Sequence, residues 1–120
     1  KRMVLQQYGV IINISSIWGE KGSSCEVAYA TTKGAVNAFT KSLARELAPS
    51  GIRVNGIQPG IIETEMLKCY DQGELEQLRG DVPLLRLGAG KDIANMVCFL
   101  ASDLASYVTA QIITVDGGYL

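Results

Sequence analysis

The sequence predicts an α/β fold built on a parallel sheet, and three observations support this prediction. Short apolar runs rich in β-branched residues alternate with longer segments in which apolar residues recur at helical spacing. The apolar runs are nearly continuous, which is typical of parallel strands covered on both faces. Serine, proline or glycine follows each run, where the chain would turn out of the sheet. These patterns indicate strand–helix–strand crossovers.

The first predicted elements are a helix end and a strand. Residues 1–8 are basic and amphiphilic, and we expect the last turns of a helix with Gly9 at its C-cap. Residues 10–14, VIINI, predict a parallel strand buried on both faces. Ser15 and Ser16 stand at its carboxyl end.

A long amphipathic helix follows a loop that contains glycine and serine. Apolar residues recur at helical spacing from Ala28 to Leu47, and the residues Pro49-Ser50-Gly51 end the pattern. We expect one stripe of this helix to cover the sheet. Its members are Ala28, Ala35, Val36, Phe39, Leu43 and Leu47.

The remaining chain predicts two further strands with a helix between them. Residues 52–57 form a short strand that ends where Pro59 and Gly60 turn the chain out of the sheet. From there to about Gly90 the sequence is irregular and acidic, with short helical pieces. Residues 111–115 form the last strand. The helix before it places three apolar residues on its inner face: Ile93, Val97 and Leu100.

Polar and glycine-rich residues gather where these strands end. They are Ser15 and Ser16, then Pro59 and Gly60, and finally Asp116-Gly117-Gly118. The carboxyl ends of parallel strands meet at one edge of a sheet, and open α/β sheets bind their ligands there. The sequence therefore predicts a site at this edge.

Composition excludes several classes of protein. The chain has 120 residues, of which 48% are hydrophobic, enough to form the core of one domain. The 11 basic and 12 acidic residues are scattered, which argues against a nucleic-acid partner. Apolar runs end well before the ~20 residues of a membrane helix and no signal-peptide pattern precedes them, so we expect a cytoplasmic protein without a membrane partner.

Two residue types restrict the chemistry. The chain has no histidine, which removes Ser-His-Asp and Cys-His catalysis and the usual zinc sites. There are three cysteines, an odd number, and they lack the spacing of metal ligands: Cys25, Cys69 and Cys98. We therefore expect no metal site. This cysteine usage fits a reducing compartment in which the thiols are buried or idle. Packing is the expected role of Cys25. Acid–base chemistry must then use Tyr, Lys, Asp or Glu.

Tyr29 and Lys33 form a candidate proton-transfer pair. Residues four apart on a helix share a face, with Cβ atoms about 5–6 Å apart. A phenol with a pKa of about 10 is a poor base at neutral pH, but a nearby positive charge favours its ionised form. Such a pair often arises by chance, so a solvated helix face remains the alternative for the pair alone.

Five segments resemble the second half of the short-chain dehydrogenase/reductases: NISS, YATTK, NGIQPGIIETEM, DIANMVCFLASD and ITVDGG. The resemblance runs from Gly9 to Gly118, with Tyr29 thirteen residues after Ser16 and Lys33 four after Tyr29. PGIIETEM and VPLLRLG are most similar to 3-oxoacyl-[acyl-carrier-protein] reductases and glucose dehydrogenase-like members. The implied fold is the carboxyl-terminal half of a Rossmann-type doubly wound parallel sheet.

The resemblance implies a catalytic set and a cofactor, NADP or NAD. Ser16 would hold and polarise the substrate carbonyl, and Tyr29 would give its proton to the carbonyl oxygen, so both also bind substrate. Lys33 would favour the phenolate and hydrogen-bond the nicotinamide ribose, with Tyr29 beside the same cofactor. The alternative for Ser16 is a helix N-cap or turn serine. We expect a structural role for Ser15.

A second cofactor-binding segment is implied after the middle strand. Pro59 and Gly60 would form the turn beside the nicotinamide, with the Ile62 backbone near the carboxamide and Thr64 toward the carboxamide or pyrophosphate. Glycine would let the backbone approach the cofactor. A plain strand-ending turn explains Pro59 and Gly60 but not the Ile-x-Thr that follows. We expect Asn55 to be structural and Asp116–Gly118 to form a turn at a subunit interface.

The family's glycine-rich turn for the cofactor pyrophosphate has no counterpart here. We therefore expect residues 1–120 to be the C-terminal part of a single NAD(P)-binding Rossmann domain, inactive alone, with the N-terminal half of the same protein as partner. Without that half the strand at residues 10–14 would expose an apolar edge prone to aggregation. Residues 61–90 would be the substrate lid, with substrate choice between Glu63 and Arg86.

Two functions remain open from the sequence. The first is an NAD(P)(H)-dependent oxidoreductase that transfers hydride between nicotinamide and a small-molecule carbonyl or secondary alcohol. The alternative is a non-catalytic binding or assembly module that keeps half of the fold. In the family, the long helix and last strand often build a tetramer, so we expect a homotetramer or homodimer in which the face of Phe39 and Leu43 contacts another subunit.

Overall fold

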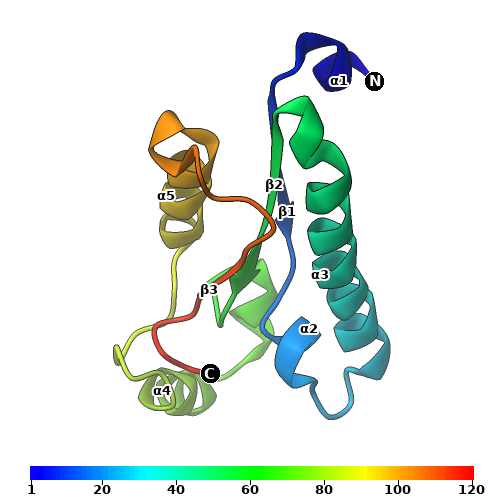
Figure 1. Cartoon of the computed structure of the whole chain (residues 1–120). Coiled ribbons are helices and arrows are strands. Elements are labelled where there is room, and N and C mark those ends of the chain that lie inside the picture. The colour runs from blue at the N-terminus through cyan, green and yellow to red at the C-terminus, as the bar shows by residue number, and fades with distance from the viewer.

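The computed structural model describes the backbone of residues 1–120 and every side chain except those of Met66 and Lys68. The strands form a parallel sheet in the order β1-β2-β3, with β2 in the middle (Figure 1). Their bounds are β1 (Gly9–Ile14), β2 (Ile52–Pro59) and β3 (Ile112–Val115). The predicted α/β class and parallel sheet are confirmed.

Two helices cover the two faces of the sheet. The long helix α3 (Val27–Leu47) lies on one face and α5 (Gly90–Ala101) on the other (Figure 1). Three shorter α-helices are α1 (Arg2–Gln6), α2 (Trp18–Lys21) and α4 (Gln72–Gly80). Short 3-10 turns span Ala48–Ser50, Glu65–Cys69 and Asp103–Ala105. None of the described helices is long and apolar enough to cross a membrane.

The core lies on both faces of β2. Ile52 and Val54 pack with Ala44 of α3, whereas Ile57 packs with Leu100 of α5. Successive side chains of a strand point to opposite faces, so an apolar middle strand serves both layers. The inner face predicted for α5 is confirmed, because Ile93, Val97 and Leu100 all join this second cluster.

The buried face of α3 differs from the predicted stripe. Thr40 is completely buried, while Phe39 is 56% exposed. Thr40 fits because Gly56 of β2 faces it, and Asn13 of β1 donates a hydrogen bond to its Oγ1 at 2.9 Å. Ala28 and Ala35 are also exposed, whereas Leu43 and Leu47 pack against the core as expected.

The first helix also ends differently from the prediction. Its left-handed C-cap is Gln7, with φ 52°, and Gly9 is already the first residue of β1. A Cβ atom at Gly9 would lie 2.6 Å from the Met3 sulfur, so a larger residue there would require the flexible Met3 side chain to move. β1 itself is only partly buried, and Ile14 is exposed, because β1 lies at an edge of the described sheet.

Candidate active site

The carboxyl end of β1 carries two buried serines to the edge of the sheet. The Ser15 N–H donates to the Ile57 carbonyl at 2.8 Å, and the Ile17 N–H donates to the Pro59 carbonyl at 3.2 Å. These bonds continue the β1–β2 pairing beyond the last residue of β1. Ser16 is thereby fixed beside the end of β2 with 6% of its surface exposed.

The first turns of α3 dock against this strand end through small residues. The Ser15 hydroxyl donates to the Lys33 carbonyl at 2.9 Å, which is a structural contact of the expected kind. A Cβ atom on Gly19 would lie 2.7 Å from the Lys33 carbonyl carbon, so glycine is needed where α2 touches α3. The backbone at Lys33 is therefore held from two sides.

Tyr29 and Lys33 lie on one face of α3, as their spacing predicts. The Lys33 Nζ atom is 5.5 Å from the centroid of the Tyr29 ring. It also donates to the Ile14 carbonyl at 3.2 Å, which holds the ammonium at the end of β1. Tyr29 is 40% exposed, and its hydroxyl has no hydrogen-bond partner in the described part of the chain. The phenol is therefore open to a ligand.

Ser16 also hydrogen-bonds the start of the short helix α2, whose N-cap residue is Ile17. Its Oγ accepts a hydrogen bond from the Trp18 N–H at 3.2 Å, and its carbonyl accepts one from the Gly19 N–H at 2.9 Å. Of the two alternatives for this serine, the turn serine thus describes a real contact, and the N-cap does not. A hydroxyl that accepts one bond still has its proton to donate, so this bond leaves a substrate contact possible.

Gly60 is required for close packing within the chain. A Cβ atom there would lie 2.6 Å from the Asp116 Cβ, so the space beside Gly60 is filled by the turn after β3. Pro59 ends β2 directly before it. The glycine therefore allows two strand ends to meet.

The backbone of Ile62 has a donor and an acceptor without partners among the described residues. Ile62 forms an isolated parallel bridge with Gly88, in which Gly88 donates to Ile61 at 2.9 Å and receives a bond from the Glu63 N–H at 2.7 Å. Parallel pairing uses the neighbours of the bridged residue, so the N–H and C=O of Ile62 have no partner among the described residues. Thr64, two residues on, is exposed and its side chain does not cap the following turn.

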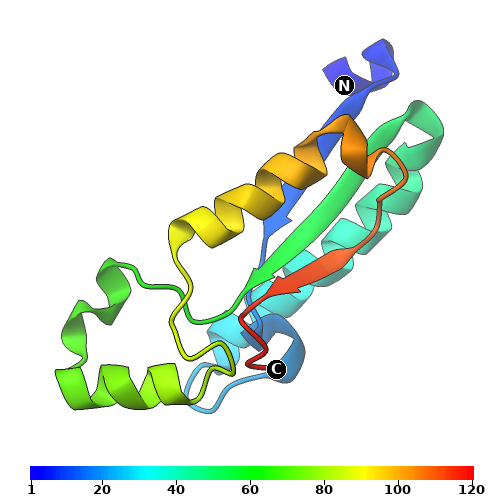
Figure 2. The same cartoon turned by 90° about the vertical axis from the view of Figure 1, so that its left-hand side faces the viewer.

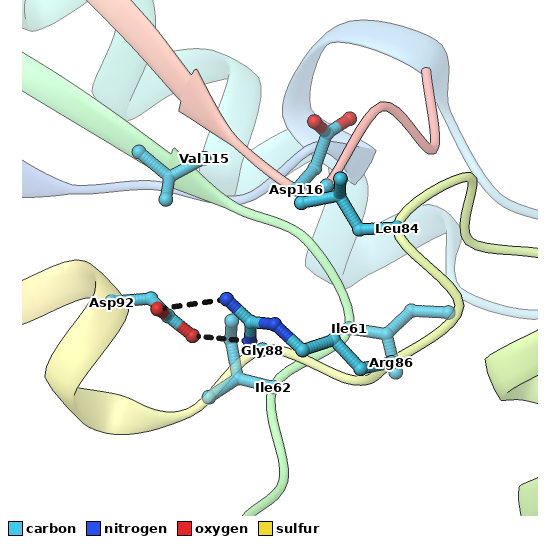
Figure 3. Close-up of a pocket in the computed structure, with 9 residues that line it drawn as sticks. Ile61, Ile62, Leu84, Arg86, Gly88, Asp92, Val115 and Asp116 are labelled. Carbon is cyan, nitrogen blue, oxygen red and sulfur yellow. Dashed lines mark hydrogen bonds and ion pairs between the residues drawn. The ribbon is translucent and has the colours of Figure 1, made fainter.

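A cavity of about 100 Å³ lies between the two ends of residues 61–90 and the turn after β3 (Figure 3). On its wall the Arg86 guanidinium binds Asp92 through two bonds of 2.8 and 3.1 Å. The Ala89 N–H donates to the same carboxylate at 2.7 Å. The Arg86 hydrogen bond and then the Ala89 N–H lower the pKa of Asp92 to about 2.

Comparison with known proteins identifies the family. The family described as Enoyl-(Acyl carrier protein) reductase matches residues 1–120. The chain belongs to the short-chain dehydrogenase/reductases. It is 47% identical over 117 residues to the uncharacterized oxidoreductase YmfI of Bacillus subtilis, covering 98% of this chain and 48% of that protein.

Further members of the family are also similar to nearly all of this chain over about half of their own length. The 3-oxoacyl-[acyl-carrier-protein] reductase FabG of Aquifex aeolicus is 44% identical over 118 residues, covering 98% of this chain and 48% of the relative. A crystal structure of 3-oxoacyl-[acyl-carrier protein] reductase from Brucella melitensis matches with a TM-score of 0.91 and 38% identity, over 99% of this chain and 45% of that one. The chain thus spans about half the length of the curated relatives it matches.

Sequence reasoning missed the polar contacts that hold the loop before β3. Arg53 donates to the carbonyls of Leu100, Ser102 and Val108, at 2.8, 3.1 and 3.4 Å. Asn55 is fully buried, donates to Val108 and accepts from the Gln111 N–H, so its expected structural role is confirmed. An arginine inside a predicted strand was the available signal for the first of these contacts.

The packing role expected for Cys25 is wrong. All three cysteines are exposed, and Cys25 has a φ of 63° in the surface loop before α3. Among the described residues, its thiol contacts the neighbouring Ser24 hydroxyl at 3.7 Å.

Proposed function

We propose that the full-length polypeptide that contains these residues is an NAD(P)(H)-dependent oxidoreductase acting on a carbonyl or secondary alcohol. The observation that supports it best is that Lys33 lies beside Tyr29 and donates to Ile14 at the end of β1, two residues before Ser16, in a chain of the short-chain dehydrogenase/reductase family. The reduced nicotinamide would supply the hydride to a carbonyl, and the oxidised nicotinamide would accept it from an alcohol. The residues of this chain would bind the oxygen and move its proton.

Each residue of the set has a separate task in this proposal. In the reduction direction the Ser16 hydroxyl donates to the carbonyl oxygen, and the exposed Tyr29 hydroxyl transfers its proton to the same oxygen. The Lys33 ammonium, 5.5 Å from the tyrosine ring centroid, stabilises the phenolate that remains. In the oxidation direction the phenolate takes the proton back.

The donors at this edge fit the nicotinamide-ribose half of the cofactor. An ammonium has three N–H donors, and Lys33 uses one on the Ile14 carbonyl, which leaves two for ribose hydroxyls. The free N–H and C=O of Ile62 match a carboxamide, which has one acceptor and one donor group. Thr64 and the Pro59-Gly60 turn would complete this half of the site.

We further propose that the N-terminal half of the same Rossmann domain supplies the pyrophosphate site. Relatives about twice as long as this chain support that proposal.

Residues 61–90 would be the substrate lid, since they leave the sheet after β2 and return at Gly88. A 3-oxoacyl thioester is the substrate favoured by the FabG relatives and by the segments PGIIETEM and VPLLRLG. The enzyme would be a homodimer or homotetramer.

A titration of the full-length polypeptide separates this function from the scaffold alternative. NADPH and NADH are added in turn while nicotinamide fluorescence is followed, and acetoacetyl thioester is then supplied. We expect a saturable change with at least one cofactor, and cofactor oxidation that depends on the thioester. No saturable change with either cofactor would favour the binding or assembly module. Binding of a cofactor without oxidation of it would reject this thioester as the substrate.

A further inference from the structure

The residues after β3 form a turn whose shape is fixed by one carboxylate. Asp116 accepts hydrogen bonds from the N–H groups of Gly118 at 2.9 Å and Leu120 at 2.8 Å. Gly117 and Gly118 have φ values of 69° and 89°, a region that favours glycine. The turn therefore has one strongly preferred path, and it determines where the side chain of Tyr119 points.

The Tyr119 ring packs against α2, far away in the sequence. Its centroid is 6.0 Å from that of Trp18, with the ring planes at 85°, and the Lys21 ammonium is 5.1 Å from the Tyr119 centroid. Edge-to-face aromatic pairs and cations over a ring are both favourable arrangements. Trp18 and Tyr119 are partly buried, so part of this contact is shielded from water.

Trp18 is also the residue that hydrogen-bonds Ser16. Its N–H donates to the Ser16 Oγ at 3.2 Å, and the next residue, Gly19, packs on the Lys33 backbone. A displacement of Trp18 would therefore change the surroundings of the Ser16 hydroxyl. The edge-to-face contact with Tyr119 is a second support of Trp18, beside these backbone contacts.

The same turn also contacts the end of the proposed lid. The Leu84 N–H donates to the Gly117 carbonyl at 3.2 Å. A Cβ atom on Gly117 would lie 2.7 Å from a Val82 methyl, and one on Gly118 would lie 3.2 Å from the Pro83 ring. The turn thus lies between residues 82–84 and α2, and it joins the two segments that flank the strand ends.

We propose that Tyr119 is a positioning residue, whose ring holds Trp18 and thereby the loop that carries Ser16. This inference rests on the proposed function, because it assigns Tyr119 to the support of a catalytic serine. The turn at Asp116 anchors the ring of Tyr119. Because the same turn contacts residues 82–84, it links the position of the proposed lid to the loop that carries Ser16. The contribution of Tyr119 comes from the ring and not from the hydroxyl.

Three substitutions in the full-length polypeptide test this role. Tyr119→Leu removes the ring, Tyr119→Phe keeps it without the hydroxyl, and Tyr107→Leu removes a fully exposed tyrosine as matched control. We expect Tyr119→Leu to lower kcat about two- to tenfold, the range of one aromatic pair, with the KM for cofactor nearly unchanged. Tyr119→Phe and Tyr107→Leu should keep the parent kcat.

The fluorescence of Trp18 provides a readout that does not need activity. Trp18 is the single tryptophan of these 120 residues, and subtracting the spectrum of a Trp18→Phe variant isolates its emission in the full-length polypeptide. Tyr119→Leu should move this emission to longer wavelength as the indole meets water, while Tyr119→Phe and Tyr107→Leu should not.

Several results would overturn the inference while the proposed function stands. One is an active parent whose Tyr119→Leu variant keeps kcat, whether or not Trp18 emission shifts. Another is a loss of kcat that Tyr119→Phe shares in full, which would assign the effect to the hydroxyl. A parent that binds no nicotinamide and turns over no carbonyl would instead reject the proposed function itself.

Discussion

The strand ends and the proposed lid lie at the same edge of the molecule but are built differently. Ser16 is nearly buried, and the β2 positions beside it, Ile57 and Gln58, are buried too. In contrast, α4 has no buried residue and lies away from the sheet (Figure 2), and Leu84 is 64% exposed. One region is fixed by packing on both faces, and the other is fixed mainly where it joins the sheet.

This difference separates two requirements of the proposed reaction. Groups that transfer a proton must keep a fixed geometry, so they belong on strand ends and helix turns whose backbone is held by packing. A lid must open and close, and segments with few buried contacts have the low local stability that this needs. The Ile62–Gly88 bridge and the Arg86–Asp92 pair close the base of the lid, so we expect motion about these two points.

The largest expected contrast in stability is between Ile57 and Leu84. Ile57→Ala removes a fully buried side chain between the sheet and α5, and should lower the free energy of unfolding by about 2–5 kcal/mol. Leu84→Ala in the exposed lid should change it by less than about 0.5 kcal/mol. Denaturant unfolding of the full-length polypeptide measures both, and equal losses would contradict the contrast.

A smaller loss is expected when the polar support of the loop before β3 is removed. Arg53→Met leaves the carbonyls of Leu100, Ser102 and Val108 without their donor, which should cost about 1–3 kcal/mol in free energy of unfolding. Arg53→Lys keeps the charge but loses the planar fork, so its stability should be intermediate. A Met variant as stable as the parent would show that water replaces these bonds fully.

The base of the lid should respond to acid. The pKa of Asp92 is lowered from 3.8 to about 2 by the Arg86 hydrogen bond and the Ala89 N–H, so the folded state favours the ionised form. The resulting stabilisation is complete above about pH 4 and is lost as the pH falls toward 2. Asp92→Asn should flatten this part of the pH–stability curve. An unchanged curve would mean that the pair is broken in solution.

The smallest effect concerns a strained backbone position at the lid end. Leu85 has a φ of 53°, which costs a non-glycine residue about 1–2 kcal/mol. Leu85→Gly relieves this strain and adds about 0.5–1 kcal/mol of entropy cost, so a net stabilisation between about 0 and 1.5 kcal/mol is expected. Leu84→Gly, at a position without positive φ, should destabilise instead. Equal shifts in melting temperature would contradict the strain.

The sequence predicted the elements well because their signals are local. β-branched runs located the strands, and the 3.6-residue period located α3 and α5. Which residue faces inward was harder, because it depends on partners distant in the chain. Phe39 points outward since Asn13 and Gly56 select Thr40 instead, and Gln7 takes the left-handed position expected of Gly9.

The candidate site also has features that local sequence patterns predicted and contacts that they did not. The spacing of Tyr29 and Lys33 predicted their shared face, and Ser16 was found because a strand end precedes it. No local pattern pairs Arg86 with Asp92 or Trp18 with Tyr119, because tertiary folding alone brings these residues together. The roles assigned to the catalytic and cofactor-binding residues stay predictions.

The turnover of Tyr29→Phe tests the central claim most directly. The substitution keeps the ring next to Lys33 but removes the transferable proton, in the full-length polypeptide with nicotinamide cofactor and a carbonyl substrate. We predict a kcat lower by roughly 10²- to 10⁴-fold with cofactor binding retained, while Tyr107→Phe keeps the parent rate. Turnover of Tyr29→Phe at the parent rate would contradict the assignment of proton transfer to the strand-end site.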